Sequence, residues 1–157
     1  MKKNADYKKI IAHNRRVRYD YFIDEVIETG IVLTGSEVKS LRSNNASISE
    51  SYADVEKGCI VLINTFIPEY KPAKFFSHEP RRVRKLLLHK KQVKKLIGLL
   101  KIKGMTLVPV SIYFNNKNLV KVELGVVRGK KEYDKRASIK EDDWKRQKAR
   151  VMKGDYK

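Results

Sequence analysis

The apolar residues of this chain fall mostly into short runs of the kind that form strands. Tyr52–Glu56 and Cys59–Ile67 are separated only by Lys57-Gly58. Farther along, Thr106–Phe114 and Leu119–Val127 flank a short polar loop. Runs rich in β-branched and aromatic residues with brief polar connections are typical of β-hairpins. The pattern therefore predicts two hairpins.

A helical period occurs in two other places. The first predicted helix ends at Gly30, and its apolar stripe consists of Tyr19, Phe22, Ile23, Val26 and Ile27. The second spans residues 89–104, and its apolar face consists of Val93, Leu96, Ile97 and Leu100. Spacing of i, i+3, i+4 and i+7 places these side chains on one side of a helix. We therefore expect an early helix against the sheet and a longer helix between the hairpins.

The segment that follows Gly30 changes period again. Residues 31–43 favour one or two strands with a bulge or bend at Gly35. Asn44-Asn45 marks a turn, because asparagine tolerates the left-handed region. Ser47 and Glu50 then indicate a single capped helical turn.

Together these elements predict a mainly β fold. About six short strands with one inserted helix are typical of a small closed antiparallel barrel of the oligonucleotide-binding type. We expect this barrel over residues 14–128 with flanking helices, an exposed loop at 71–80, and a flexible basic arm at 1–13. A flexible basic tail follows at 129–157.

The net charge indicates the class of partner. The chain has 36 lysines and arginines against 18 acids, a formal charge of +18. Such a surface attracts polyphosphates at long range, and displaced counterions supply much of the binding free energy. The alternative is a charged surface that only keeps the protein soluble. We favour nucleic acid as the partner and a membrane is not expected, because no predicted helix combines a basic face with a broad apolar one.

Cysteine usage and hydropathy suggest the compartment. Cys59 is the single cysteine, so no internal disulfide can form, and we read it as buried strand filler. No apolar run approaches the length of a membrane span, and the N-terminus lacks the hydrophobic core of a signal peptide. The sequence therefore predicts a cytoplasmic protein.

Candidate chemistry is sparse. The three histidines lie in unrelated contexts, and no phosphate-loop, dinucleotide or hydrolase motif is present. An acidic cluster of Asp20, Asp24, Glu25 and Glu28 has the side chains for a Mg²⁺ site, which a nuclease would need. Neighbouring basic residues make structural pairing the favoured interpretation. We therefore expect no enzyme activity, no metal and no cofactor.

The segment 129–157 has too few apolar residues to build a core, so alone in water it should be mostly unstructured. Ser138 and Glu141 form a possible capping box for a helix that starts near Ile139. One face of that helix would carry Trp144, Lys148, Val151 and Met152. This thin apolar stripe on a basic rod predicts a tail that folds against a partner.

Several blocks in order resemble one family. They are Glu28-Thr29-Gly30 with Leu33–Arg42, then Arg84–Leu88, then Thr106–Pro109, and finally Gly129-Lys130-Lys131 with Asp134-Lys135-Arg136. Each block alone is weak, but together they cover nearly the whole chain from Asn14 on. The chain resembles small protein B, the bacterial SsrA-binding protein of trans-translation.

The resemblance implies an RNA-binding protein without catalytic activity. Members of this family bind the tRNA-like domain of transfer-messenger RNA (tmRNA) and carry it into the empty decoding site of a stalled ribosome. Their tail passes the 16S rRNA decoding centre and enters the vacant mRNA channel, where it becomes helical. We therefore expect tmRNA and the ribosome as partners, and a monomer. The alternative is a structural ribosomal protein with a basic extension.

The resemblance also assigns residues. The surface that meets tmRNA would comprise Asn14, Glu28, Lys39, Arg42, Arg84, Lys85 and Leu87. The decoding-centre segment would comprise Gly129, Lys130, Lys131, Tyr133, Asp134, Lys135 and Arg136. The part in the channel would comprise Ile139, Lys140, Glu141, Trp144 and Met152. Lysine and arginine would pair with phosphates, Asn14 would read base or sugar edges, and Leu87 would contact an unstacked base.

Three positions depart from the family pattern. Asn44-Asn45 replaces a turn that usually holds glycine and lysine, which removes one expected phosphate contact at position 45. His89 stands where asparagine is common, so the cap of the long helix should be weaker. Tyr133 occupies a position where histidine is also found, and either ring can stack on an RNA base.

Overall fold

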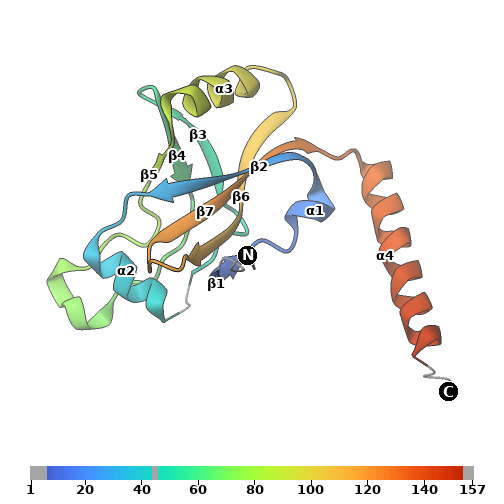
Figure 1. The fold of residues 1–157 in the computed structure, drawn as a ribbon, viewed down its shortest axis with the longest axis horizontal. Coiled ribbons are helices and arrows are strands. Elements are labelled where there is room, and N and C mark those ends of the chain that lie inside the picture. Colours follow the sequence, from blue (N-terminus) through green and yellow to red (C-terminus); the bar gives the residue numbers. More distant parts are fainter. Residues whose placement is uncertain (1–6, 44–45, 154–157) are drawn as a thin grey trace, which may run out of the picture.

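The computed structural model describes residues 7–43 and 46–153, and their strands form one antiparallel sheet (Figure 1). Its strands are β1 (Lys9–His13), β2 (Tyr21–Ile31), β3 (Tyr52–Glu56), β4 (Cys59–Ile63), β5 (Arg84–Leu87), β6 (Met105–Phe114) and β7 (Val120–Gly129). Their order in the sheet is β1-β6-β3-β4-β5-β2-β7, with a further pairing between β6 and β7. That last pairing joins the two halves of the sheet.

Six of the described strands therefore close into a ring, β6-β3-β4-β5-β2-β7 and back to β6. β1 lies outside this ring and pairs with the end of β6, where Lys9 is opposite Phe114. β3 pairs with β6 closer to its start, where Ala53 is opposite Leu107. The predicted mainly β fold with antiparallel closure is confirmed.

The interior of the ring holds the main hydrophobic core. Fully buried members include Ile60, Leu62, Leu107, Ile112 and Leu124. A second, smaller cluster of valines packs against Tyr21 and Ile23, and consists of Val17, Val108, Val110 and Val127. Burial of this apolar surface is the main source of the fold's stability.

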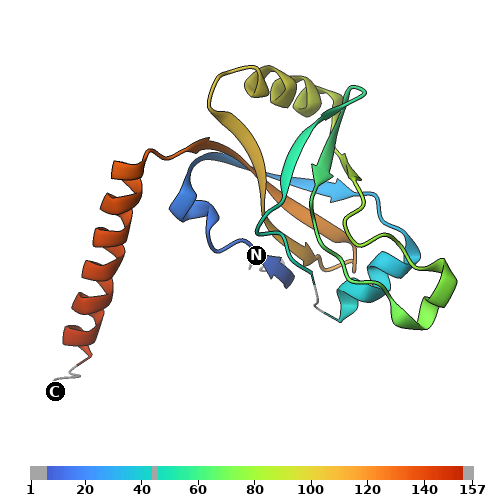
Figure 2. The ribbon, with the colours of Figure 1, turned by 180° about the vertical axis from the view of Figure 1, so that it is seen from behind.

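The helices are α1 (Val17–Asp20), α2 (Gly35–Arg42), the short 3₁₀ helix η1 (Lys71–Phe76), α3 (Lys90–Leu100) and α4 (Glu132–Met152). Seen from behind, α3 and α2 lie at opposite ends of the sheet, and α4 projects away from it (Figure 2). α3 closes one end of the ring by burying Leu96 in the core. The hairpins and α3 are found as the sequence predicted, although β4 ends at Ile63 and α3 at Leu100.

Two predicted elements are wrong. Residues 21–27 are not a helix, because they belong to β2, which pairs with β5 and β7, and only Tyr19 and Asp20 of the predicted segment lie in the short helix α1. Side-chain burial alternates along β2, but the apolar Phe22 and Val26 lie on its exposed face, at 43% and 48% exposure, so the apolar residues do not follow the two-residue period typical of strands. Residues 31–43 are not mainly strand, because after Ile31 the chain forms α2. The Glu37 carboxylate accepts a hydrogen bond from the Thr34 N–H at 2.8 Å and so caps this helix.

Smaller differences concern turns and caps. Ser47 forms an isolated bridge with Phe66 rather than starting a helical turn. The predicted exposed loop contains η1. The predicted weak cap at His89 is supported by Gln92, whose side chain accepts the His89 N–H at 3.1 Å. The predicted turn at Asn44-Asn45 lies outside the described residues.

The two tails also differ from the simplest expectation. The predicted flexible arm at 1–13 contains β1, which is paired with the sheet, while residues 1–6 lie outside the described part. The C-terminal helix begins at Glu132, before the predicted start near Ile139. Ser138 is therefore not its cap, and its hydroxyl donates to the Asp134 carbonyl inside the helix at 3.0 Å.

Candidate RNA interface

β5 divides its side chains between the core and the surface. Arg84 and Leu86 are buried, whereas Lys85 and Leu87 are exposed on the other face. Successive side chains of a strand point to opposite faces, so Lys85 and Leu87 share one outer surface. Leu87 is 54% exposed, which is unusual for a leucine between two paired strands. An exposed leucine beside a lysine is a suitable surface for an RNA base and its phosphate.

Two pockets flank Leu87. The first has a volume of about 450 Å³ and the second a volume of about 430 Å³. The latter is lined by Glu28, Gly30, Leu87, Leu88, His89, Gln92 and Lys121. A Cβ on Gly30 would lie 3.1 Å from the Leu87 Cβ, so glycine is what lets Leu87 lie so close to β2. The predicted residues Glu28 and Leu87 therefore meet at one site.

Glu28 is the acceptor of this surface. It is exposed on β2, and its carboxylate accepts a hydrogen bond from the Tyr113 hydroxyl. A carboxylate repels phosphate but accepts from base N–H groups or a 2′-hydroxyl. Lys121 adds a cation to the same pocket, opposite Gly30 in the pairing of β2 with β7. The sequence analysis missed Lys121, because only the register of the two strands brings it here.

α2 carries the other predicted cations. Lys39 and Arg42 are both exposed on this helix. The Lys39 ammonium lies 5.6 Å from the centre of the Tyr70 ring, which orients it across the surface. Both side chains are therefore accessible to phosphate oxygens, and their contact with tmRNA stays a prediction.

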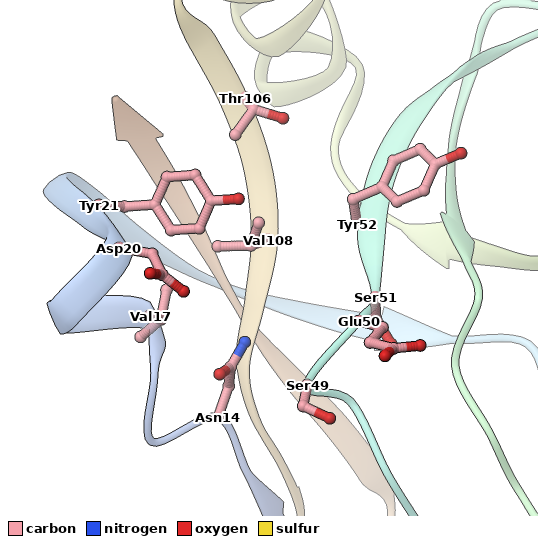
Figure 3. A pocket seen from close by; sticks show the side chains of 10 residues that line it. All are labelled: Asn14, Val17, Asp20, Tyr21, Ser49, Glu50, Ser51, Tyr52, Thr106 and Val108. Carbon is pink, nitrogen blue, oxygen red and sulfur yellow. The ribbon is translucent and has the colours of Figure 1, made fainter. Parts of the chain in front are cut away.

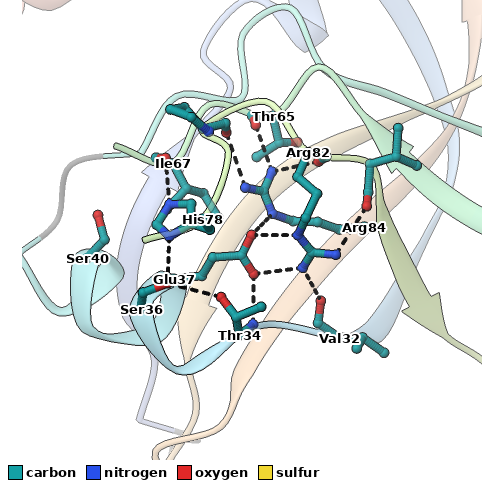
Figure 4. Close-up of polar contacts among 12 residues, drawn as sticks. Val32, Thr34, Ser36, Glu37, Ser40, Thr65, Ile67, His78, Arg82 and Arg84 are labelled. Carbon is teal, nitrogen blue, oxygen red and sulfur yellow. Dashed lines mark hydrogen bonds and ion pairs between the residues drawn. The ribbon is translucent and has the colours of Figure 1, made fainter. Parts of the chain in front are cut away.

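A buried ionic network lies beneath α2 (Figure 4). Glu37 and Arg84 are both fully buried, and the Arg84 Nε donates to Glu37 Oε1 at 2.8 Å. Arg82 donates to the same carboxylate through Nε at 3.1 Å and Nη2 at 2.8 Å. The Arg84 Nη1 also donates to the Thr65 carbonyl at 2.8 Å. One carboxylate thus joins α2 to the two arginines at the start of β5.

Arg84 therefore does not belong to the outer surface. Its side chain has no exposed area, and the donors of its guanidinium are engaged by Glu37 and backbone carbonyls. The prediction that Arg84 contacts tmRNA directly does not fit this position, because a phosphate cannot reach a buried guanidinium. Arg84 instead holds α2, and with it Lys39 and Arg42, against the sheet.

Charge and burial act against each other in this network. Burial would raise the pKa of Glu37, but hydrogen bonds from Arg82 and Thr34 and the charge of Arg84 outweigh it and hold the pKa below its ordinary value. Burial lowers the pKa of the Arg84 guanidinium, although Glu37 opposes this. Next to them, His78 bonds Ser36 through Nδ1 and donates from Nε2 to the Ile67 carbonyl, each at 2.9 Å.

Asn14 lies away from the pocket that contains Glu28 and Leu87. It is 5% exposed, and its Oδ1 accepts the Arg16 N–H at 3.2 Å. It lines a separate pocket of about 250 Å³ (Figure 3), which shares no lining residue with the pocket around Leu87. The structure therefore does not bring Asn14 together with Glu28 and Leu87.

The start of the tail is fixed to the sheet. Gly129 is the last residue of β7 and lies opposite Tyr21. The Lys130 ammonium donates to the Arg18 carbonyl at 2.8 Å and to the Ser138 hydroxyl at 2.9 Å. Lys135 approaches Asp20 at 3.7 Å. These contacts position the first turn of α4 beside α1.

Beyond this turn the tail is exposed. Lys131, Arg136, Lys140 and Glu141 face solvent, while Asp134 is half-buried. Tyr133 lies in the first turn of α4, and its side chain is outside the described residues. The apolar residues of the tail are also uncovered, with Ile139 at 41%, Trp144 at 60% and Met152 at 79% exposure. The tail thus presents its predicted stripe without a partner in the described part of the chain.

The acids at positions 20–28 pair with separate groups. Asp24 bonds Arg128 at 3.1 Å, Glu25 bonds Lys95 at 2.6 Å, and Glu28 bonds Tyr113. Within residues 7–43 and 46–153, no three His, Cys, Asp or Glu side chains gather closely enough to hold a metal ion. None of the described helices is long and apolar enough to cross a membrane.

Comparison with known proteins identifies the family. The model of the SmpB protein family matches residues 11–154. The chain belongs to the SmpB family. It is 56% identical over 151 residues to the SsrA-binding protein of Orientia tsutsugamushi strain Ikeda, covering 96% of this chain and 99% of that protein. It is 59% identical over 147 residues to that of Caulobacter vibrioides, covering 94% and 97%.

A solved structure gives the same answer. The chain is similar to a protein in the work described as "tmRNA-SmpB: a journey to the center of the bacterial ribosome". The TM-score is 0.63 at 44% identity, and the match covers 81% of this chain and 85% of that one. Fold and family thus agree with the resemblance seen in the sequence.

Proposed function

We propose that this protein binds the tRNA-like domain of tmRNA and delivers it to stalled ribosomes in the cytoplasm. The observation that carries the proposal is the nearly full-length similarity to SsrA-binding proteins, at 56% identity over 151 residues. The protein acts as a monomer that binds RNA and does not catalyse a reaction.

Glu28, Leu87 and Lys121 form the centre of the tmRNA contact. Leu87 supplies apolar surface for an unstacked base, Glu28 accepts from a base or a 2′-hydroxyl, and Lys121 pairs with a phosphate. Lys85, Lys39 and Arg42 extend the positive surface on either side. Arg84 contributes by holding α2 in place through Glu37.

The tail acts on the ribosome. Residues from Gly129 to Arg136 meet the decoding centre, and α4 beyond them lies in the empty mRNA channel. Support comes from the position of Lys130, whose contacts with Arg18 and Ser138 fix where the tail leaves the sheet. The exposed Trp144 and Met152 supply apolar surface to the channel wall. We infer that the tail is disordered in the free protein and becomes helical there.

Sequencing of RNA crosslinked to the protein in cells tests the proposal. A single tRNA-like RNA should dominate the crosslinked fraction. Ribosomal RNA alone, recovered with one protein on every ribosome, would contradict it and favour a structural ribosomal protein. The protein should also be substoichiometric to ribosomes and enriched on truncated messages.

The absence of catalysis has a separate test. The purified protein, incubated with labelled RNA and Mg²⁺, should leave the RNA intact. Specific cleavage that is lost in Asp24→Asn or Glu25→Gln variants would contradict the proposal and assign the acids to a nuclease site.

A further inference from the structure

The pocket beside Asn14 has the features of a binding site for a single base. It lies between α1 with the start of β2 on one side and residues 49–52 on the other, with Thr106 and Val108 of β6 between them (Figure 3). Its volume of about 250 Å³ is below the roughly 300–1,000 Å³ of sites for drug-sized ligands. The space therefore suits one base rather than a whole nucleotide.

Asn14 is a fixed donor in this pocket. The side chain is almost fully buried, and its Oδ1 is engaged by the Arg16 N–H. The amide nitrogen therefore has to point the other way, into the pocket, as Figure 3 shows. Within the described part of the chain, no acceptor takes a hydrogen bond from this nitrogen. The arrangement leaves a preoriented N–H donor facing an open space.

Asp20 is a free acceptor next to it. Its carboxylate is near two cations, with Oδ2 3.8 Å from Arg16 Nε and Oδ1 3.7 Å from Lys135 Nζ. Both distances exceed those of hydrogen bonds, so the cations balance the charge without occupying the lone pairs. Among the described residues, none donates a hydrogen bond to this carboxylate. The pocket thus offers a charged acceptor beside a neutral donor.

The apolar part of the pocket is rigid. Tyr21 packs against the valine cluster of Val17, Val108, Val110 and Val127, and three members of this group line the pocket. An aromatic ring held in this way gives a base a surface to stack on, without a further loss of side-chain entropy. Asp20 and Glu50, both in the lining, disfavour a phosphate inside the pocket. The ligand should therefore enter with its base edge, and its phosphates should remain outside, near Arg16 and Lys135.

We propose that this pocket binds one unpaired guanine of an RNA. Guanine places a carbonyl oxygen beside two N–H donors on its Watson–Crick edge. Asn14 would donate to that carbonyl, and the Asp20 carboxylate would accept from both N–H groups. Uracil and adenine each offer an acceptor beside one N–H donor, and cytosine places its ring-nitrogen acceptor against the carboxylate, so each of them satisfies fewer of these groups than guanine. The site is distinct from the tmRNA surface at Leu87, and it depends on the proposed function only in that the partner is RNA.

Short RNAs test the base preference of the intact protein. Fluorescence anisotropy would compare labelled pentanucleotides UUGUU, UUAUU and UUUUU, together with a version in which inosine replaces the guanine. Base pairing by a bidentate side chain is worth about 1–3 kcal/mol of discrimination, so UUGUU should bind about tenfold more tightly than UUAUU or UUUUU. Inosine lacks the exocyclic amine and should fall between them.

The Asp20→Asn variant should lose this preference while its affinity for UUUUU stays unchanged. Asp24→Asn is the matched control, since it makes the same charge change four residues away, on an acid that pairs with Arg128 outside the pocket. Equal affinity of the wild-type protein for all pentanucleotides would overturn the proposal. A guanine preference that survives in Asp20→Asn would overturn it as well.

Two larger RNAs distinguish the source of the guanine. Affinity of the Asp20→Asn variant would be measured for the tRNA-like RNA and for small ribosomal subunits. A loss of about tenfold with one of them, and none with Asp24→Asn, identifies that RNA as the source. An unchanged affinity for both would overturn the proposal. Failure of the wild-type protein to bind the tRNA-like RNA would instead count against the proposed function, whatever the result for Asp20→Asn.

Discussion

The ring of strands and the C-terminal helix are stabilised in opposite ways. The ring has an apolar interior and a buried ionic network in which Glu37 and Arg84 have no exposed area. α4 spans 21 residues, yet none of its described side chains is buried, and Trp144 is 60% exposed. Its first turns contact α1, where Lys135 lies 3.7 Å from Asp20. The ring is therefore built to be rigid before it meets RNA, whereas the tail needs a partner to gain its stability.

The difference shows how one small protein can recognise two partners. A rigid surface keeps Glu28, Leu87 and Lys121 in fixed positions, so little conformational entropy would be lost if RNA binds there, as we propose. A tail without a core has low stability alone, so its folding depends on the surface that receives it. We expect changes in the ring to alter stability and RNA affinity, and changes in the tail to alter ribosome function alone.

Glu37→Gln should have the largest effect on stability. It leaves the buried Arg84 guanidinium without its counter-charge, which typically costs about 3–5 kcal/mol in the free energy of unfolding. Urea unfolding followed by circular dichroism would measure this. The matched control is Glu141→Gln, which removes an exposed acid paired with Lys145 in α4 and should change the free energy by less than about 0.5 kcal/mol. A loss below about 1 kcal/mol for Glu37→Gln would contradict the role given to the network.

The same network predicts a dependence of stability on pH. The pKa of Glu37 is lower in the folded protein than its ordinary value, because Arg82, Thr34 and Arg84 outweigh the effect of burial. Its contribution is therefore complete above the unfolded pKa of about 4.3, and it is lost as pH falls from there through the folded value. Urea midpoints between pH 3 and 6 should fall at the acid end in the wild-type protein. The fall should be smaller in Glu37→Gln, and equal slopes would contradict this assignment.

Substitutions on the outer face of β5 should affect RNA affinity more than stability. Leu87→Ala removes exposed apolar surface and should weaken binding of the tRNA-like RNA by about fivefold, roughly 1 kcal/mol. Lys85→Ala should remove about one phosphate contact, so the slope of log binding constant against log salt concentration should decrease in magnitude by about one. Lys140→Ala is the control in the tail and should change neither quantity. A salt slope that Lys85→Ala leaves unaltered would remove this residue from the phosphate contacts.

Trp144→Ala should have the smallest effect on stability. The Trp144 side chain is 60% exposed, and the Lys148 ammonium lies 5.1 Å from the centre of its indole ring. Loss of the indole should therefore change the free energy of unfolding by less than about 0.5 kcal/mol. Tagging of nascent chains on stalled ribosomes should nevertheless decrease. Unchanged tagging would show that the apolar stripe of the tail is not used, and a large loss of stability would show that the tail belongs to the core.

Local patterns in the sequence predicted the hairpins and α3 because each depends on neighbours a few residues apart. β2 was missed because its apolar residues lie on both faces, with Phe22 and Val26 exposed and Ile27 buried, and pairing with β5 and β7 overrides the apparent helical spacing. α2 was missed although Thr34 and Glu37 have the spacing of a capping box. β5 was not predicted as a strand, because four residues are too few for a clear period.

The surface could be predicted only in part for the same reason. Family resemblance supplied Glu28, Lys85 and Leu87, and the structure places them on accessible faces. The resemblance could not distinguish Arg84 from the RNA-contacting residues, because Arg84 has the positive charge of a phosphate-binding residue but is buried like a core residue. Lys121 and the acceptor at Asp20 depend on which strands become neighbours, and this follows from tertiary pairing that no local pattern encodes.

Removal of α4 tests the division between ring and tail most directly. A variant ending at Lys131 keeps the pairing of Gly129 with Tyr21 and the Lys130 contact with Arg18. Its affinity for the tRNA-like RNA should remain within about tenfold of the full chain, which is 1.4 kcal/mol, while tagging on stalled ribosomes should be abolished. A larger loss of RNA affinity, or tagging that persists without α4, would contradict the account.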